Sequence, residues 1–318
     1  MSLDILTFGE ALVEVMRTGL DQPLDRPGPF VGPYPSGAPF IFAVQAARLG
    51  ARVAAVGAVG DDAFGRCLLD QLREDGVETH GVHVLPGHTT GVAFVAYSSD
   101  GSRDFVFHLR HAAGGQLTPA LLDETLFEGL KVLHLMGSTL SIHEEALQAG
   151  QRALALAKAA GARFSFDPNL RPQLMPADQA RLAFAPFVEA ADVLLPTAEE
   201  ARLLTGQPTT EEAVAALLAG RPERIVIITQ GAAGCTVHQR DSTAYVPGFA
   251  VEEVDPTGAG DCFDAGFLVS WLAGQTPVEA ARFANACGAL AVTAQGPMAG
   301  ARRLEEVLAF VEEEKRHD

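Results

Sequence analysis

Long apolar runs and closely spaced cysteines are both missing from this sequence. No stretch reaches 18 consecutive apolar residues, so we expect no membrane-spanning helix. The four cysteines, Cys67, Cys235, Cys262 and Cys287, form no CxxC pair, which argues against a zinc site and a disulfide framework. Residues 1–6 lack a basic segment followed by an apolar one, so no signal peptide is expected. These absences predict a soluble, cytoplasmic protein with no membrane partner.

Basic residues are also scarce. The sequence has 23 Lys and Arg against 40 Asp and Glu, a formal net charge of −17. Such a charge repels a phosphate backbone, so we expect no nucleic-acid partner. A small anionic ligand stays possible, because net charge says little about one pocket. The 318 residues are 48% hydrophobic and contain no low-complexity tract, which excludes disorder and suits one large domain or two modest ones.

Two common nucleotide-binding motifs are absent as well. No strand-like segment is followed by GxGxxG with an acid about 20 residues further on, which argues against a nicotinamide dehydrogenase. No GxxxxGK[ST] motif occurs, and the only lysines are Lys131, Lys158 and Lys315. The sequence therefore argues against a P-loop kinase.

Short β-rich segments alternate with amphipathic helical segments along most of the chain. We expect buried strands at residues 5–8, 52–56, 131–135, 163–166 and 225–228. We expect helices at residues 39–49, 63–75, 143–160, 177–190 and 198–205. This alternation predicts an α/β fold with a mainly parallel sheet covered on both faces. Such sheets bind ligands beyond the carboxyl ends of their strands.

Two pieces of the sequence interrupt this alternation. Residues 91–97 and 103–109 flank an Asp-Gly turn at 98–102, a pattern typical of a β-hairpin. Residues 12–17 are a further strand-like segment, and the Pro- and Gly-rich segment 19–37 has the composition of a loop. We interpret these pieces as a small β lid above the α/β body. The alternative is an ordinary antiparallel edge of the main sheet.

The glycine-rich segment 254–267 carries the strongest chemical signal. Gly258 and Gly260 let a ligand approach the backbone amides closely, at the start of a helix expected from about Gly260 to Leu272. Unpaired amides at a helix N-terminus form an anion site. Asp261 in that site could accept a proton from a hydroxyl that attacks a bound phosphate. The alternative is a purely structural helix start, in which Asp261 is a favourable early-helix residue.

Several motifs, in order along the chain, resemble those of the ribokinase/PfkB family of sugar kinases. Residues 255–261 (DPTGAGD) resemble the C-terminal signature, and residues 36–50 followed by 59–65 resemble the N-terminal signature. Residues 167–171 (DPNLR) resemble the substrate-side motif of fructokinase-like and 2-keto-3-deoxygluconate-kinase-like members. Residues 195–201 are similar to the NxxE region, 229–234 to the nucleotide loop and 285–296 to the adenine end. Residues 36–42 (SGAPFIF) resemble a tagatose-kinase-like subgroup, and the resemblance covers nearly the whole chain.

The resemblance implies a fold and a domain organisation. We expect a ribokinase-like three-layer αβα fold with a mainly parallel central sheet and a small β-sheet lid, within a single kinase domain of residues 1–318. The body would comprise about 1–11, 38–88 and 116–318, and the lid about 12–37 and 89–115. Lids of this family often pair through exposed strands, which implies a homodimer.

The resemblance also implies an activity. The chain would be an ATP-dependent sugar kinase that transfers the γ-phosphate to a hydroxymethyl group of a ketose or a keto-deoxy sugar acid. Asp261 would be the general base, and the amides of Gly258, Ala259 and Gly260 would stabilise the charge on the γ-phosphate. The alternatives are a catalytically silent regulator that binds sugar and nucleotide, and a kinase for another acceptor such as ribose or a nucleoside.

The remaining implied residues hold the cofactors and the sugar. Glu200 would act on Mg²⁺ through water, and Asp255 would belong to a monovalent-cation site, which makes K⁺ a candidate cofactor. The residues implied for ATP are Thr229, Gly231, Gly234 and Asn285. Those implied for the sugar are Glu14, Gly37, Ala38, Phe107, Asp167, Asn169 and Arg171, with closure about Gly37 excluding water.

Some of these residues also have simpler interpretations. Arg171 would bind a substrate carboxylate or form a structural salt bridge. Glu14 would hold sugar hydroxyls or be an exposed strand acid, and Phe107 would cover a sugar face or pack within the lid.

The chain departs from the family pattern at three positions. Ser36 replaces a usual Gly, Ile41 an Asn that contacts sugar, and Thr197 the Asn of NxxE. Because the loss of the Asn at position 41 removes a polar contact, strict ribokinase specificity is not expected.

Overall fold

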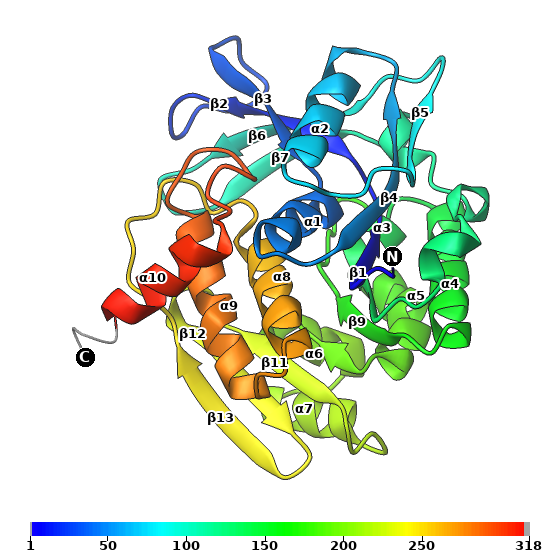
Figure 1. The fold of residues 1–318 in the computed structure, drawn as a ribbon. Coiled ribbons are helices and arrows are strands. Elements are labelled where there is room, and N and C mark those ends of the chain that lie inside the picture. The colour runs from blue at the N-terminus through cyan, green and yellow to red at the C-terminus, as the bar shows by residue number, and fades with distance from the viewer. Residues whose placement is uncertain (1, 315–318) are drawn as a thin grey trace.

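The structure is a computed structural model that describes residues 2–314 (Figure 1). Residue 1 and residues 315–318, the ends of the expected domain 1–318, lie outside the described residues.

A nine-stranded sheet forms the centre of the described part of the chain, in the order β13-β12-β11-β10-β9-β8-β1-β4-β5. Its strands are β1 (Ile5–Phe8), β4 (Val53–Gly60), β5 (Val82–Leu85), β8 (Val132–Met136), β9 (Arg163–Asp167), β10 (Val193–Leu194), β11 (Ile225–Thr229), β12 (Gly234–Gln239) and β13 (Ser242–Pro247). All neighbours from β11 to β5 run parallel, and β12 and β13 add an antiparallel edge. The predicted mainly parallel sheet is therefore confirmed.

Helices cover both faces of this sheet (Figure 1). One face carries α1 (Ala38–Arg48), α2 (Ala63–Glu74), α8 (Ala259–Leu272) and α9 (Pro277–Ala291), with α10 (Leu304–Glu314) packed outside α9. The other carries α3 (Gly137–Leu140), α4 (Glu144–Ala159), α5 (Ala177–Ala190), α6 (Ala198–Thr205) and α7 (Thr210–Leu218). Short 3₁₀ turns occupy Ala113–Gly115, Pro119–Leu121, Glu124–Phe127 and Gly231–Ala233. The strands are buried on both faces because each face packs into its own apolar cluster, which gives the three-layer αβα fold predicted above.

A separate four-stranded sheet, here called the small sheet, has the order β3-β2-β6-β7. Its strands are β2 (Leu12–Arg17), β3 (Phe30–Ser36), β6 (Gly91–Tyr97) and β7 (Arg103–His108). The predicted hairpin is present as β6 and β7, and β2 pairs with β6 in parallel. Because these strands form their own sheet, the alternative of an antiparallel edge on the main sheet is wrong.

The expectation of a loop over 19–37 is also wrong for its second half, which forms β3. Pro33 and Pro35 lower the strand propensity of this segment, yet β3 lies at the edge of the small sheet. A proline lacks the amide donor that a central strand needs, and an edge strand tolerates that loss.

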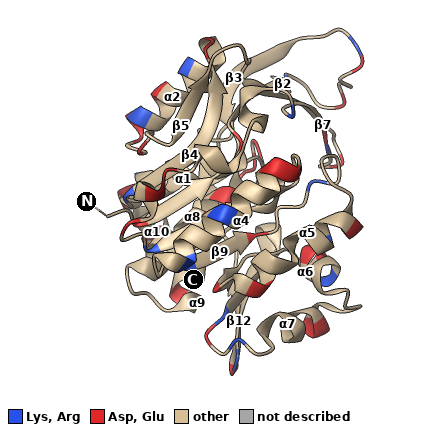
Figure 2. Cartoon of the chain, turned by 90° about the vertical axis from the view of Figure 1, so that its right-hand side faces the viewer, with Lys and Arg blue, Asp and Glu red and all other residues tan. Residues whose placement is uncertain are grey.

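Charged side chains lie mainly on the outer helices and loops, and the central strands carry few of them (Figure 2). Among residues 2–314, no helix combines the length and the apolar character needed to span a bilayer.

Candidate functional site

A cleft of about 620 Å³ lies between the carboxyl ends of the central strands and the small sheet. The main sheet contributes residues that follow β1, β8, β9 and β11, as expected for parallel strands. The predicted residues that line the cleft are Glu14, Gly37, Ala38, Phe107, Asp167, Asn169, Arg171, Glu200, Thr229, Gly258, Ala259, Gly260 and Asp261. A larger hollow of about 990 Å³ beside α7 and β12 contains none of the predicted site residues.

The first turn of α8 faces this cleft with its backbone amides. Gly258 has a φ of 86° and precedes the helix, and no side chain caps the helix N-terminus. A Cβ at Gly258 would lie 2.5 Å from the carbonyl oxygen of Pro297, so only glycine fits there. A Cβ at Gly260 would meet no atom within 4 Å, so the space beside this turn is open. The turn therefore has the geometry of an anion site.

Asp261 lies in the same turn and is 8% exposed. Burial raises the pKa of Asp261 to about 7, the charge of Arg171 lowers it, and the carboxylates of Glu10 and Glu14 raise it further. A carboxylate with a pKa near neutrality suits general-base chemistry.

Glu14, on β2, is a second buried acid with one free oxygen. It is 6% exposed, so the interpretation as an exposed strand acid is wrong. Its Oε1 accepts a hydrogen bond of 2.6 Å from Ser36 Oγ, whereas its buried Oε2 has no partner among the described residues. Burial raises the pKa of Glu14 to about 7. A buried acceptor without a partner fits a ligand hydroxyl.

Glu10, which the sequence analysis missed, lies in the cleft just after β1. Ser138 Oγ donates to its Oε1 at 2.8 Å, and Thr139 Oγ1 donates to its Oε2. Burial raises the pKa of Glu10, although these hydroxyls oppose the shift. An acid directly after the first predicted strand was the available signal, because ligands bind at that end of the sheet.

The DPNLR segment turns sharply after β9. Asn169 has a φ of 38°, and its backbone N and Nδ2 donate to Asp167 at 3.0 and 3.1 Å. The same Nδ2 lies 3.5 Å from Asp261 Oδ1. Burial raises the pKa of Asp167, and the charges of Glu200 and Asp261 raise it further. The turn thus places a carboxylate and an amide next to Asp261.

Arg171 ends this segment and lines the cleft. Its Nη1 donates to the carbonyl of Leu170 at 3.0 Å, and it takes part in no ion pair within residues 2–314. A structural salt bridge is therefore not found in the described residues.

Asp264, also missed from the sequence, lies one turn after Asp261 on α8 and lines the cleft. Burial raises its pKa, and the charges of Asp167 and Asp261 raise it further. His134 Nε2 lies 3.6 Å from Asp264 Oδ2, and burial lowers the pKa of His134 to about 3. The histidine is therefore neutral near pH 7.

Glu200 forms the N-terminal capping box of α6 with Thr197. Its Oε2 accepts from Thr197 N at 2.8 Å and from Thr197 Oγ1 at 2.9 Å, and its Oε1 accepts from Leu170 N at 2.8 Å. No group of three metal-ligating side chains occurs in residues 2–314. Because both oxygens already accept hydrogen bonds, Glu200 fits contact with Mg²⁺ through water, the mode that Mg²⁺ favours.

Asp255 lies at the start of the glycine-rich loop and is 2% exposed. Its Oδ1 accepts from Tyr97 OH at 2.7 Å and from Thr257 N at 3.0 Å, and its Oδ2 accepts from Gly296 N at 2.8 Å. A carboxylate offers only oxygen atoms, which suit a hard cation. Asp255 does not line the cleft.

The residues predicted for the nucleotide lie beside the cleft, at the ends of β11 to β13. Thr229 ends β11, and Gly231 and Gly234 have φ values of 57° and 100°. A Cβ at Gly234 would lie 2.2 Å from the carbonyl oxygen of Val246. Asn285 Nδ2 donates to the carbonyls of Val246 and Pro247 at 3.1 and 3.0 Å, so its amide holds the end of β13. Gly231, Gly234 and Asn285 do not line the cleft itself.

An α/β fold with an anion-binding helix start that faces a cleft of hydroxyl-accepting carboxylates defines a kinase of small hydroxylated molecules. Comparison with known proteins supports this class. The model of the pfkB family carbohydrate kinases matches residues 3–303. The chain belongs to this family.

Individual relatives agree. Fructokinase-1 of Oryza sativa subsp. japonica is 37% identical over 316 residues, which span 97% of each chain. An E. coli protein described as ribokinase II, solved with ATP and Mg²⁺, is 39% identical with a TM-score of 0.92, covering 98% of this chain and 100% of that one. A double mutant of fructokinase from Vibrio cholerae O395, with fructose, ADP and potassium ion bound, is 31% identical with a TM-score of 0.85, covering 98% and 99%.

These findings confirm the family resemblance, the ribokinase-like fold and the enzyme class predicted from the sequence. The protein is an ATP-dependent carbohydrate kinase of the pfkB type, similar to fructokinases. ATP and Mg²⁺, the predicted cofactors, are those of the family.

Proposed function

We propose that the chain phosphorylates a hydroxymethyl group of a ketose such as fructose. The observation that carries this proposal is Asp261, a buried carboxylate with a pKa of about 7 in the uncapped first turn of α8. It lies at the one place where a base and an anion site meet in the cleft. The similarity to fructokinases supports a ketose as the acceptor.

Asp261 acts as the general base. Its carboxylate takes the proton of the sugar hydroxyl as that oxygen attacks the γ-phosphorus of ATP, while the bond from phosphorus to the β-phosphate oxygen breaks and ADP leaves. The amides of Gly258, Ala259 and Gly260 stabilise the charge that develops on the γ-phosphate, because they are fixed in place before the reaction.

ATP extends from this turn toward the ends of β11 to β13. Thr229, Gly231 and Gly234 contact its phosphates and ribose, and Asn285 lies at its adenine end. The open space at Gly231, where a Cβ would meet no atom within 4 Å, supports a close approach of the nucleotide to the backbone.

Two cations complete the site. Mg²⁺ on the ATP phosphates would neutralise their charge, and Glu200 would act on its water shell. Asp255 would hold K⁺ together with backbone carbonyls. The buried Asp255 carboxylate and the fixed Glu200 carboxylate, both of which offer only oxygen atoms, support these roles.

The sugar is held by buried acceptors and a small apolar surface. The free Oε2 of Glu14 accepts a sugar hydroxyl, and Ser36 holds that carboxylate in place. Asp167 and Asn169 contact further hydroxyls, and Gly37 and Ala38 line the cleft beside the sugar at the start of α1. Phe107, stacked on Phe105 with centroids 5.4 Å apart, covers the sugar.

A keto-deoxy sugar acid is the second candidate, because Arg171 and Arg103 both line an otherwise acidic cleft. Their guanidinium groups match a carboxylate in geometry and charge. If the substrate is an acid, Arg171→Met abolishes its turnover and leaves that of neutral sugars within about twofold. If the substrate is a neutral ketose, Arg171→Met has no such selective effect.

We also propose that residues 1–318 form a single kinase domain. The small sheet, with its loops (about 12–37 and 89–115), acts as a lid on a body of about 1–11, 38–88 and 116–318, and closure about Gly37 excludes water.

Two copies pair through the lid, because its edge strands otherwise expose unpaired backbone groups. Light scattering at micromolar concentration should give about twice the chain mass of 33.4 kDa. A mass near 33.4 kDa would reject the dimer.

The test of the catalytic proposal is an ADP-release assay with Mg-ATP and K⁺ over fructose, tagatose, ribose, 2-keto-3-deoxygluconate and a nucleoside. Asp261→Asn should lower kcat on the best acceptor by ~10²–10⁴-fold, because it removes the base. Asp70→Asn, at an exposed position of α2, is the control and should match the wild type. Retention of more than a tenth of the wild-type rate in Asp261→Asn would contradict the assignment.

A further inference from the structure

Tyr97, the last residue of β6, lies on the face of the small sheet that covers the cleft. It pairs with Arg103 of β7, and Ala93, four residues earlier and therefore on the same face of β6, pairs with Phe107. Arg103 and Phe107 line the cleft, and side chains of directly opposed residues lie on the same face of a sheet. The pleat therefore directs the Tyr97 side chain toward the body of the protein.

The Tyr97 hydroxyl reaches the start of the glycine-rich loop. It donates to Asp255 Oδ1 at 2.7 Å and lies 2.9 Å from Thr257 Oγ1. Asp255 and Thr257 are 2% and 8% exposed, so this contact is shielded from water.

The same carboxylate connects the loop to the segment that follows α9. Gly296 N donates to Asp255 Oδ2 at 2.8 Å, and a Cβ at Gly258 would lie 2.5 Å from the Pro297 carbonyl. Residues 255–260, which lead into α8, therefore have the small sheet on one side and the segment 296–303 on the other.

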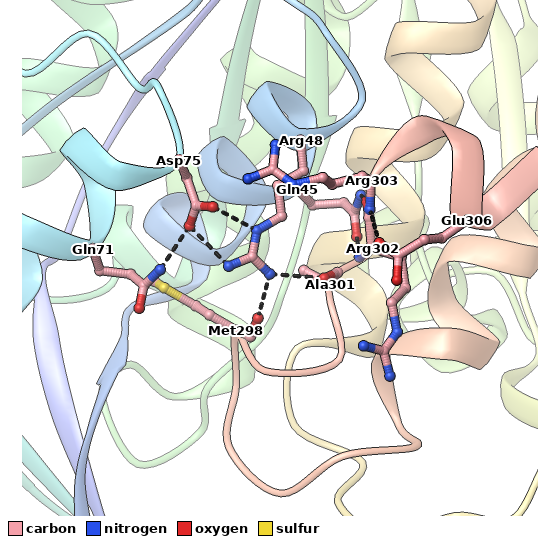
Figure 3. Close-up of polar contacts among 9 residues, drawn as sticks. All are labelled: Gln45, Arg48, Gln71, Asp75, Met298, Ala301, Arg302, Arg303 and Glu306. Atoms are coloured by element: carbon pink, nitrogen blue, oxygen red, sulfur yellow. Dashed lines mark hydrogen bonds and ion pairs between the residues drawn. The ribbon is translucent and has the colours of Figure 1, made fainter.

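The segment 296–303 is itself bound firmly to α1 (Figure 3). Arg48 Nη1 donates to the carbonyls of Met298 and Ala301 at 2.8 and 2.7 Å. Gln45 exchanges hydrogen bonds with the backbone of Arg302, at 2.9 and 3.2 Å. This side of the loop is fixed within the body, and the Tyr97 contact ties the loop to the small sheet through the buried carboxylate.

We propose that Tyr97 is a positioning residue whose hydroxyl fixes the Asp255 carboxylate, and through it the loop 255–260 with the amides that face the transferred phosphate. This contact then fixes the position of the anion site relative to the small sheet. The expected effect of Tyr97 on catalysis rests on the proposed function, whereas its expected effect on the loop 255–260 does not.

Hydrogen exchange tests the structural consequence without sugar or ATP. In Tyr97→Phe, which removes only the hydroxyl, the amides of residues 255–262 should exchange about tenfold faster than in the wild type, because a hydrogen bond to a carboxylate is lost. Tyr34→Phe is the matched control: the Tyr34 ring packs against Gly296 from β3, and its hydroxyl has no hydrogen bond among the described residues. Unchanged exchange in Tyr97→Phe, or an equal change in Tyr34→Phe, would overturn the proposal.

Steady-state kinetics on the best acceptor tests the catalytic consequence. Tyr97→Phe should lower kcat about tenfold and leave the KM for ATP within about twofold, since the loop amides act mainly in the transition state. Tyr34→Phe should retain the wild-type kcat. Faster exchange with an unchanged kcat would refute the proposal that Tyr97 positions the loop amides. A raised KM for ATP with an unchanged kcat would indicate a merely structural contact and would also refute it.

Asp255→Ala supplies a second variant that leaves Tyr97 in place and removes the acceptor, and residues 255–262 should again exchange faster than in the wild type. If Tyr97 acts through Asp255, adding Tyr97→Phe to Asp255→Ala changes neither the exchange of residues 255–262 nor kcat by more than about twofold. Additive effects of the two substitutions would show that Tyr97 acts by another route.

Discussion

At the scale of single residues, the cleft is characterised by acids that burial keeps partly protonated. Glu14 and Asp261 both have a pKa of about 7. A folded protein with such groups holds protons that the unfolded chain releases. They therefore contribute stability below about pH 4 that is lost as the pH rises through 7. This stability is partly lost at neutral pH, where the same carboxylates can take up a proton during catalysis.

The pH dependence of activity follows from the same two groups. The base must be deprotonated to act, so kcat/KM should fall as the pH drops below about 7. The negative charge of Glu14 raises the pKa of Asp261, so Glu14→Gln should shift this acidic limb to lower pH. A pH–rate profile of both enzymes measures the shift.

Glu74→Gln, on the exposed side of α2, is the control for that experiment and should leave the profile unchanged. An acidic limb in Glu14→Gln that stays in place or moves to higher pH would contradict the coupling between Glu14 and Asp261.

The sequence could predict those site residues whose functional partners are close to them in the sequence. Asp261 stands out because its glycines are neighbours in the sequence. Ser36 was noted only as a departure from the family pattern, and its bond to Glu14 depends on strand pairing. Glu10 meets its hydroxyl partners 128 and 129 residues away, and Tyr97 meets Asp255 158 residues away. Such contacts arise only from the tertiary fold, so periodicity and spacing carry no signal for them.

At the scale of elements, the strength of the local pattern decided what could be predicted. The five helices predicted from the alternation agree with α1, α2, α4, α5 and α6 to within one residue at each end, and the helix predicted from about Gly260 to Leu272 agrees equally well with α8. No strand was expected at β5, β10, β12 or β13. β10 has only two residues, and β12 and β13 form an antiparallel extension that the βα alternation does not indicate. β3 was missed because its prolines matter less at a sheet edge.

Two capping boxes within residues 2–314 offer a test of the role of Glu200. Thr197 with Glu200 caps α6, and Thr276 with Glu279 caps α9 in the same geometry. Glutamine also serves in a capping box, so Glu279→Gln should change the free energy of unfolding by less than about 0.5 kcal/mol. Glu200→Gln should cost about 1 kcal/mol more, because its NH₂ group cannot replace the oxygen that accepts from Leu170 N. Only Glu200→Gln should raise the Mg²⁺ concentration needed for half-maximal activity, by about fivefold or more, because it loses the charge that acts on the metal's water shell.

Magnesium titrations of the two variants decide this question. An identical Mg²⁺ dependence in Glu200→Gln and Glu279→Gln would mean that Glu200 only caps its helix.

At the scale of the whole molecule, contacts between the first and last parts of the chain hold the site together. Arg48 of α1 forms a bidentate ion pair with Asp75, at 2.7 and 2.9 Å, just after α2. It also binds carbonyls 250 and 253 residues further along the chain (Figure 3). The three-layer fold was predictable from the alternation of elements. This closure was not, because neither α1 nor the segment 296–303 carries a local pattern that indicates the other.

Removal of this arginine should therefore destabilise the entire domain. The side chains of Arg48 and Asp75 are only 16% and 4% exposed, so Arg48→Met leaves a buried carboxylate without its partner and should cost about 3 kcal/mol of unfolding free energy. Arg73→Met removes a comparable ion pair with Asp70 whose side chains are 59% and 65% exposed, and should cost less than about 1 kcal/mol. Urea unfolding of both variants measures the difference. Equal costs would contradict this prediction, because the buried ion pair would then contribute no more than an exposed one.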